Sequence, residues 1–430
     1  MTRHAAAPAP ERARTLLAAA LLLHILPFAV RPALIGGDEP HYALMAHSIA
    51  TDLDLSLRDE YGDVERGSAA AGRKRRGEAL DRHVRQVGAA EVFSHPIGLP
   101  ALLAPLAALQ QVLAPGSAPD VPFGLAALLV TFAALLAGAR LLVGMTGSAR
   151  EAALLLFGIY FCSPLWFYSR TLFTEPFTWA FGVLAVASIV SGRFWLAALL
   201  LGLTLAMKET ALLVVAPVVV AAAFRFGWKR AAVLAAGPLA WGAIFAAKNL
   251  VTVGTPFSTF QTYEVGEVVS GAGGLLFDPA RGLLWFAPLL LAAVAGWFLR
   301  ARDRSDRIAG WASLAIFIGY FLLTAAWVDW RGGSSYGPRL LVPALPALAV
   351  PLVRLWRGRT ERAWRALLAA GALGGFIVNG CAALDPFSAF WGPPAWELVA
   401  KNGAAAGAGA AGGVFVLWFL SKNERVSSRA

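Results

Sequence analysis

Charged residues are scarce in this sequence of 430 residues: Asp, Glu, Lys and Arg make up 15%, whereas hydrophobic residues make up 58%. A water-soluble domain of this length needs more charge to cover its surface, so the composition excludes a soluble globular protein. Cysteine is nearly absent, because only Cys162 and Cys381 occur, both in apolar runs. The sequence therefore indicates no disulfide framework and no zinc site, and both thiols are expected to pack as small core residues.

The charge that is present is mostly positive, and the formal net charge is +11. In a soluble protein this excess would point to nucleic acid, but here the basic residues form short clusters between apolar runs. Such clusters are typical of cytoplasmic loops in membrane proteins, so we expect no nucleic-acid partner. The repeated uncharged stretches of about 17–22 residues match the thickness of a bilayer core. They predict an all-α integral membrane protein with about 12 transmembrane helices. The Ala-, Arg- and Gly-rich composition is compatible with a high-GC bacterium, so we expect the protein in a bacterial plasma membrane.

The threading of the chain depends on one apolar stretch, 97–113, inside a long segment of mixed polarity. The first apolar run, 16–30, follows a basic tail, which places the N-terminus in the cytoplasm. If 97–113 crossed the membrane, the richest arginine clusters downstream would lie outside. If it lies along the interface, the later loops obey the positive-inside rule. We therefore predict spans near 121–141, 151–168, 176–191, 194–207, 210–224, 231–248, 283–299, 308–326, 340–353, 366–383 and 403–420.

This threading divides the chain into seven segments. They are a cytoplasmic tail (1–15), a first transmembrane helix (16–33), a first extracytoplasmic loop with juxtamembrane helices (34–120), transmembrane helices of a catalytic module (121–250), an extracytoplasmic loop (251–282), C-terminal transmembrane helices (283–420) and a cytoplasmic tail (421–430).

In this topology the unusual polar residues gather in loops on the outer, non-cytoplasmic side. A carboxylate at the membrane surface can act as a general base toward an acceptor hydroxyl. Arg and Lys, together with the amides of a Gly-Gly turn, can hold a phosphate leaving group. The loops that carry such residues are 37–42, 168–176, 208–209, 248–249, 252–281 and 327–339.

Plainer interpretations of the same residues stay open. Asp38 and Glu175 each precede a proline at a helix start, where a carboxylate also serves as a cap. Asp38, Glu39 and His41 lie within one helical turn and offer an alternative divalent-metal site, although we expect no cofactor. Lone His24 is expected to be packed or hydrogen-bonded. Aromatic residues at span ends, Trp166, Tyr168 and Trp327, are typical of belt anchors, and Lys208, Lys248 and Arg281 can snorkel toward headgroups.

The ordered set of these segments resembles the GT-C glycosyltransferases that use polyprenyl-phosphate-linked sugars. The closer likeness is to the bacterial branch related to protein O-mannosyltransferases and the lipid A aminoarabinose transferase. The residues that carry it form five short motifs: Gly37-Asp38-Glu39-Pro40-His41-Tyr42, Ser94-His95-Pro96-Ile97-Gly98, Leu172-Phe173-Thr174-Glu175-Pro176, Lys208-Glu209 and Tyr336-Gly337-Pro338-Arg339. The second motif is similar to the family's entry to a juxtamembrane helix, in agreement with an interfacial 97–113. Lys208-Glu209 departs from the pattern, because Pro often follows the Lys.

The resemblance implies an inverting transfer of a sugar from a membrane polyprenyl phosphate to a glycan, lipid or protein acceptor of the cell envelope, on the extracytoplasmic face. Asp38 would be the general base and Glu175 the second acidic residue. Arg339 would be the best candidate for the lipid-linked phosphate. The candidate substrate-binding residues are Glu39, His41, Tyr42, His95, Arg170, Lys208, Arg281, Asp329, Arg331, Tyr336 and Arg339.

The alternative function is a multi-spanning lipid or solute transporter or flippase. Ion-coupled transporters place ionisable groups near the membrane midplane, on broken helices in repeated halves. The predicted spans here are nearly free of charge and contain no visible repeat. Polar residues collect at one face instead, which favours chemistry at the membrane surface.

Overall fold

A computed structural model describes residues 10–407 and 411, apart from residues 33, 88–89, 258–262, 359–360 and 405. The described chain is almost entirely helical, and its one sheet is a two-stranded antiparallel hairpin. The elements are α1 (Pro10–Val30), α2 (Glu39–Thr51), α3 (Arg58–Glu65), η1 (Arg73–Arg75), β1 (Val84–Val87), β2 (Ala90–Phe93), α4 (Gly98–Leu113), α5 (Asp120–Thr146), α6 (Ala149–Tyr160), α7 (Pro164–Tyr168), α8 (Thr174–Val190), α9 (Phe194–Met207), η2 (Glu209–Ala211), α10 (Leu212–Phe226), α11 (Trp228–Val253), α12 (Val268–Phe277), α13 (Leu283–Phe286), α14 (Pro288–Ala293), η3 (Val294–Phe298), α15 (Arg304–Ala326), η4 (Arg339–Leu348), α16 (Ala349–Gly358), α17 (Arg362–Leu384), α18 (Pro386–Phe390) and α19 (Ala395–Lys401).

The expected fold class, an all-α multi-spanning membrane protein, is confirmed. Among the described residues, six helical segments are long and apolar enough to cross a bilayer, and six shorter apolar segments of 10–17 residues accompany them. The six long segments are 120–146, 209–226, 228–253, 304–326, 339–358 and 362–384. The predicted span at 403–420 and both terminal tails fall largely outside the described residues.

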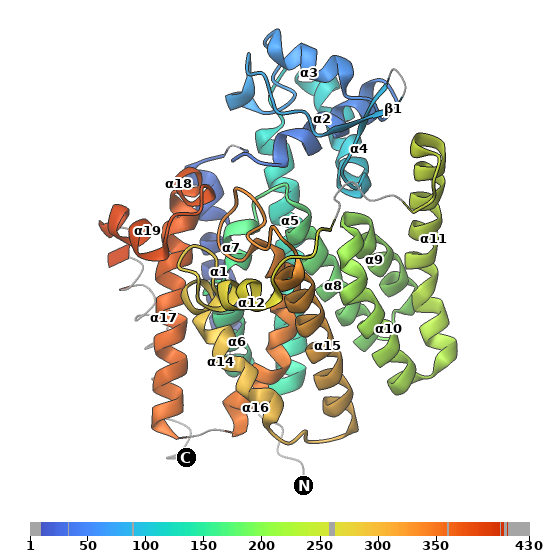
Figure 1. Ribbon diagram of the computed structural model, residues 1–430. Helices are drawn as coiled ribbons and strands as arrows, with labels where there is room; N and C mark the ends of the chain where they lie inside the picture. The colour runs from blue at the N-terminus through green and yellow to red at the C-terminus, as the bar shows by residue number, and fades with distance from the viewer. Residues whose placement is uncertain are drawn as a thin grey trace.

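A small outer domain caps one end of the helical bundle (Figure 1). It contains α2, α3, the β1–β2 hairpin and α4, and it has a hydrophobic core of its own around Leu44, Met45, Leu57 and Tyr61. α4 packs along α2 in this domain and touches the bundle at α9, where Gly98 lies directly against the Ala206 carbonyl. The apolar stretch that could have been a span is therefore a helix between the outer domain and the bundle.

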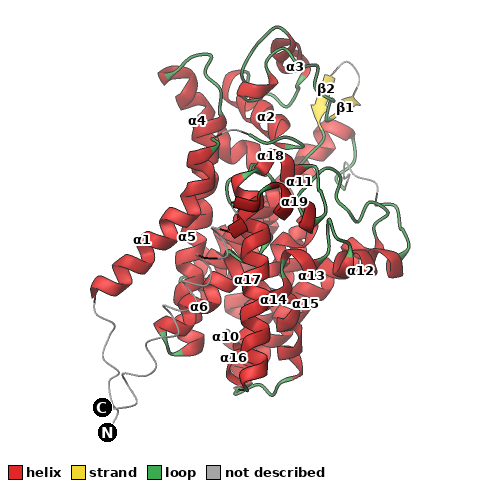
Figure 2. Ribbon diagram, turned by 90° about the vertical axis from the view of Figure 1, so that its left-hand side faces the viewer, coloured by secondary structure: helices red, strands yellow, loops and turns green. Residues whose placement is uncertain are grey.

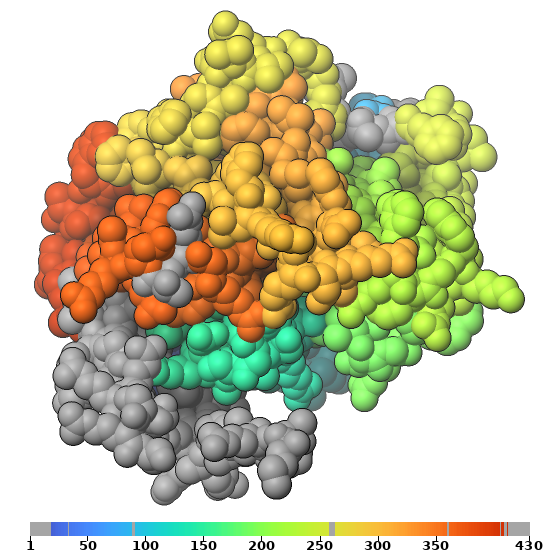
Figure 3. All heavy atoms as spheres, turned by 90° about the horizontal axis from the view of Figure 1, so that it is seen from below, coloured from blue at the N-terminus to red at the C-terminus, as the bar shows by residue number. Residues whose placement is uncertain are grey.

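Close helix contacts build the bundle below this domain. α9 and α11 approach through Gly202 and Gly237, whose backbones touch, as small residues permit in membrane helices. Figure 3, which views the molecule from the end opposite the outer domain, shows this green group of helices beside the yellow and orange segments of residues 280–360. The two groups meet where α10 packs against α15.

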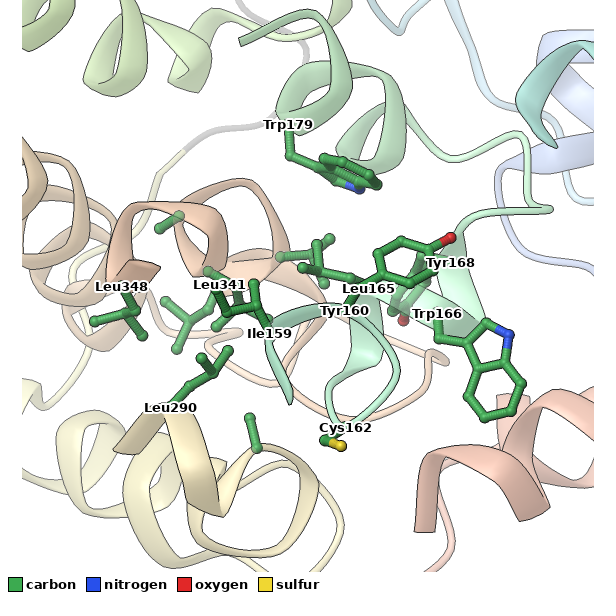
Figure 4. Packing of buried hydrophobic residues seen from close by; sticks show 14 of the residues in the cluster. Ile159, Tyr160, Cys162, Leu165, Trp166, Tyr168, Trp179, Leu290, Leu341 and Leu348 are labelled. Atoms are coloured by element: carbon green, nitrogen blue, oxygen red, sulfur yellow. The ribbon is translucent and has the colours of Figure 1, made fainter. Parts of the chain in front are cut away.

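Three predicted spans differ from single straight helices, because proline interrupts each of them. The 151–168 span divides into α6 and α7 at Ser163-Pro164, and the 283–299 span divides at Ala287-Pro288. The 340–353 span begins as the 3₁₀ segment η4, which contains Pro343 and Pro346. Proline lacks the amide hydrogen that a helix interior requires, so the chain changes course at these points. Figure 4 shows the core where these pieces meet, with Leu165 of α7 near Leu341 of η4 and Leu290 of α14 in the same cluster.

The arginine-rich turns gather at the end of the bundle away from the outer domain. The α10–α11 turn, the start of α15 and the α16–α17 connection all lie there (Figure 1), and the turned view agrees (Figure 2). Arg354 of α16 donates to the Asp306 carboxylate of α15 at 3.0 Å. The loops between the outer ends of the helices face the opposite way, toward α2 and α4.

Candidate functional site

The site begins at Asp38, the residue immediately before α2. Helix α2 starts here because Pro40 fits the first helical turn and cannot extend a preceding helix. Asp38 occupies the N-cap position, but its side chain makes no cap hydrogen bond. The carboxylate instead accepts a hydrogen bond from the Arg339 guanidinium, with 2.6 Å between Nη2 and Oδ2. Its side chain is 16% exposed, so the carboxylate remains reachable from the surface of the site.

Arg339 joins Asp38 to the second acidic residue, Glu175. The Nε of Arg339 donates to Glu175 Oε1 at 3.1 Å, and the Lys208 ammonium lies 3.6 Å from the same oxygen. The Glu175 side chain is 2% exposed and those of Arg339 and Lys208 are 11% and 18% exposed. Two carboxylates and two cations thus form one partly buried, charge-balanced cluster, which we call the acidic–basic cluster (Asp38, Glu175, Lys208, Arg339). Ionic groups removed from water require this kind of mutual compensation.

A tyrosine pair fixes the turn that precedes Arg339. The Tyr168 hydroxyl donates to the Tyr336 carbonyl at 2.7 Å and accepts from the Tyr336 amide at 3.0 Å. The Tyr336 hydroxyl donates to the Asn379 side-chain oxygen at 2.9 Å. The Arg339 guanidinium itself lies 4.3 Å from the centre of the Phe173 ring, a cation–π contact. These contacts fix the turn before η4, so the guanidinium reaches both carboxylates without much freedom.

Glu39, unlike Asp38, binds backbone amides and not the Arg339 guanidinium. One of its carboxylate oxygens accepts from the Ile35 and Gly36 amides at 2.5 and 2.9 Å, and the other accepts from the Leu172 amide at 2.9 Å. Glu39 therefore ties the loop before α2 to the loop before α8. These two loops carry Asp38 and Glu175, so Glu39 sets the distance between the acidic residues.

Three histidines stand beside Asp38. His83 Nδ1 lies 2.8 Å from His95 Nε2 and 3.9 Å from Asp38 Oδ1, and the His41 ring stacks on His83 at 3.8 Å. The Tyr61 hydroxyl accepts from the His83 amide at 3.0 Å and lies 2.8 Å from His41 Nδ1, so it links these two histidines. Ligand atoms of Asp38, His83 and His95 all lie within 4.8 Å of one another, so these three residues, rather than Asp38, Glu39 and His41, are the group near the site that can hold a metal ion.

The charges of the cluster shift the ionisation of its members. Burial alone would raise the pKa of the Asp38 carboxyl, but Arg339, the nearby histidines and Lys208 hold it well below its usual range. Burial lowers the pKa of His95 to about 4 and that of His41 to about 3. At neutral pH the site therefore combines an ionised Asp38 with neutral imidazoles at His41 and His95. Burial raises the pKa of Glu39, although its three amide hydrogen bonds oppose this change.

A pocket opens next to Glu175 and Lys208. These two residues supply its charged end. Its walls come from α8, η2, α15 and η4, and they are largely apolar and aromatic: Tyr263, Tyr320, Leu323, Trp327, Leu340 and Pro343. A ligand with an anionic group and a long apolar part fits this division of charged end and apolar wall.

Other residues expected to bind substrate make structural contacts here. Arg170 donates to the backbone carbonyls of Pro27 and Arg31 at the end of α1, and Arg281 donates to those of Arg331 and Gly333. Tyr42 is buried against Phe93 and His95 in the outer domain. Asp329 and Arg331 are exposed, and Arg331 covers the Trp330 ring.

Sequence reasoning missed two residues of the site. His83 belongs to no motif and lies in the loop region before β1, so nothing local indicated its role. Tyr168, interpreted as an aromatic belt anchor, is fully buried and holds the Tyr336 turn. Trp166 is likewise buried and donates to the Leu23 carbonyl at 3.0 Å. His24 is packed as expected, with the Tyr160 hydroxyl 2.7 Å from its Nδ1.

Comparison with known proteins identifies solved structures of similar fold. No protein-family model matches the sequence, and no curated protein matches it either. Two solved structures are similar over most of the chain. ArnT from Cupriavidus metallidurans bound to undecaprenyl phosphate aligns over 97% of this chain and 73% of its own, with a TM-score of 0.57 and 15% identity. The apo state of the same protein aligns over 95% and 76%, with a TM-score of 0.52 and 16% identity. The chain therefore has the fold of ArnT, in agreement with the fold that the sequence resemblance implied.

Proposed function

We propose that this protein transfers a sugar from a polyprenyl phosphate to a cell-envelope acceptor on the extracytoplasmic face of the membrane, with inversion at the anomeric carbon. The observation that carries the proposal is the acidic–basic cluster beside a cavity with a charged end and apolar walls. The fold adds support, because ArnT has been crystallised with undecaprenyl phosphate. The acceptor is a glycan, a lipid or a protein with a free hydroxyl or a similar nucleophile.

In the proposed reaction Asp38 is the base. Its carboxylate takes the proton of the acceptor hydroxyl while the acceptor oxygen attacks the anomeric carbon from the face opposite the phosphate. The bond between the anomeric carbon and the phosphate oxygen breaks, and the electron pair leaves with the polyprenyl phosphate. One displacement of this kind inverts the anomeric centre. Glu175 keeps Arg339 oriented from the other side.

The cluster balances charge during this step. The donor is a phosphodiester with one negative charge, and the leaving polyprenyl phosphate carries two. Asp38 loses its negative charge when it accepts the proton, so Arg339 is released from one partner as the phosphate acquires the second charge. Arg339 and Lys208 can then bind the phosphate, which stabilises the developing negative charge where it forms. The low pKa of Asp38 in the free protein suits this sequence, because a phosphate that draws Arg339 away makes the carboxylate a stronger base.

The test is a transfer assay on purified protein with a panel of polyprenyl-phosphate sugars and membrane extracts as acceptors. Asp38→Asn removes the base but keeps the side-chain shape, and the expected loss of kcat is about 10²–10⁴-fold. Arg339→Ala removes a hydrogen-bond donor to the leaving phosphate, and the expected loss of kcat is about 10²–10³-fold. Full activity in Asp38→Asn would overturn the base assignment.

A matched control separates these effects from general damage. Asp63→Asn makes the same chemical change at an exposed carboxylate of α3, outside the acidic–basic cluster, and its transfer rate should equal that of wild type. Release of free polyprenyl phosphate, measured by mass spectrometry, reports the reaction whichever acceptor is used. Movement of the intact donor lipid across a vesicle membrane, without any release of polyprenyl phosphate, would instead favour a flippase.

A further inference from the structure

The outer domain carries a second group of acidic side chains where α2 ends and α3 begins. This group is separate from the acidic–basic cluster. Asp52 follows the last residue of α2, and Asp59 and Glu60 occupy the first turn of α3. One oxygen from each of these three carboxylates lies within 4.8 Å of the others. Oxygens that share one calcium ion, each 2.3–2.6 Å from it, are separated by no more than about 5 Å. The spacing therefore suits ligands of a single ion.

Glu60 is the unusual member of this group. Asp52 and Asp59 are exposed, as acidic side chains near helix ends commonly are, but Glu60 is only 4% exposed. Among the described residues, no donor forms a hydrogen bond of normal geometry with either of its carboxylate oxygens. A favourable position in the first turn of a helix accounts for an acidic residue, but it does not account for one that is buried without a donor. A buried carboxylate in this condition requires either a proton or a cation.

The chain directs this carboxylate toward the other two. Tyr61 and Val64, which follow Glu60 on α3, pack into the core of the outer domain and fix the helix. On the α2 side, the Ser48 hydroxyl donates to Asp54 Oδ1 at 2.9 Å and lies within 3.1 Å of the Ser56 carbonyl. These contacts anchor the 52–57 connection, so both halves of the acidic group are held by packed structure.

We infer that Asp52, Asp59 and Glu60 form a structural calcium site that joins the C-terminal end of α2 to the N-terminal end of α3. Calcium accepts carboxylate oxygens in irregular geometry, whereas magnesium demands near-ideal octahedral geometry and keeps its water. Two exposed carboxylates and one buried carboxylate form an irregular set of ligands, so they suit calcium better than magnesium. Because Asp38, the proposed base, lies immediately before α2, the ion would stiffen the helix that positions the base.

The test measures calcium binding to the full-length protein purified in detergent and stripped with chelator. Equilibrium dialysis with radioactive calcium is expected to give one more bound ion per chain for wild type than for Glu60→Gln. Calcium should also raise the midpoint of thermal unfolding of wild type but not that of Glu60→Gln. In chelator, Glu60→Gln should be at least as stable as wild type, because the amide replaces a buried carboxylate that has lost its ion.

Two further variants keep the result decisive. Glu65→Gln makes the same change at an exposed position at the end of α3 and should keep both the bound ion and the thermal shift. Asp52→Asn alters only an exposed side chain, so it should fold normally and weaken calcium affinity by about tenfold or more. Equal calcium binding by wild type and Glu60→Gln would overturn the site, as would unchanged affinity in Asp52→Asn. An equal affinity for magnesium would overturn the calcium assignment.

Discussion

At the scale of single residues, Arg339 decides the state of the site, because both catalytic candidates depend on its guanidinium. Removing one partner from a buried ionic group costs about 3–5 kcal/mol, since the remaining charges lose their compensation. Without Arg339, Asp38 and Glu175 would lose their shared cation, and Lys208 would remain 3.6 Å from Glu175. Such a group adds little net stability, so its presence is better explained by chemistry than by folding.

Residue-level chemistry also shows the limit of sequence reasoning. Asp38, Glu175, Lys208 and Arg339 were all expected on one face from the order of short motifs, and the structure brings them together. His83 was not expected, because its approach to Asp38 depends on the course of the β-hairpin. The roles assigned to these residues stay predictions until activity is measured.

The histidines beside Asp38 predict how stability depends on pH. The pKa of His95 is lowered by burial to about 4, against an ordinary value of 6.5, while Asp38 opposes that shift and His83, Lys208 and Arg339 add to it. A lowered histidine pKa means that the unfolded chain binds protons more readily, so stability falls as pH drops from about 6.5 to about 4. The contribution of His95 is at most about 3 kcal/mol. The midpoint of thermal unfolding, measured in chelator, should fall as the pH drops through this range, and His95→Gln should make this fall smaller. An equal slope in both proteins would contradict the assignment.

At the scale of elements, apolar runs predicted most helices well. The predicted 194–207 coincides with α9, and 308–326 falls within α15. Interruptions at Ser163-Pro164 and Ala287-Pro288 were not predicted, because a hydropathy pattern reports burial in lipid and not the path of the backbone. The Tyr168–Tyr336 contact joins residues 168 positions apart, and no local pattern reveals a contact over that separation.

The junction between α7 and the turn before η4 yields an element-scale prediction. Tyr168→Phe removes both hydrogen bonds to the Tyr336 backbone and leaves a buried amide and carbonyl without partners. The expected cost is about 1–3 kcal/mol, and kcat should fall more than KM changes because Arg339 loses its support. Tyr160→Phe is the control, since this buried tyrosine bonds His24 instead. Equal losses of kcat in the two variants would show that general loosening, not the Arg339 turn, is responsible.

At the scale of the whole molecule, the arginine-rich turns of the bundle are separated from the outer domain, and the two lie at opposite ends (Figure 1). Asp38 lies directly before α2 of that domain, which itself also carries the basic run 73–76. A membrane protein with this distribution is expected to keep its basic end in the cytoplasm. The sequence could anticipate the separation because loop charges alternate along the chain. It could not anticipate the compact outer domain, since the core of that domain joins residues spread from Leu34 to Phe93 and beyond.

The orientation that we expect from this separation can be measured in intact cells. Asp81→Cys places a thiol at an exposed position in the outer domain, and Lys229→Cys places one in the α10–α11 turn at the basic end. The native Cys162 and Cys381 are buried, so a membrane-impermeant maleimide should leave them unlabelled. We expect labelling of Asp81→Cys in cells whose plasma membrane is exposed to the reagent, and labelling of Lys229→Cys only after that membrane is opened. The reverse pattern would place the acidic–basic cluster in the cytoplasm, where the proposed extracytoplasmic transfer could not occur.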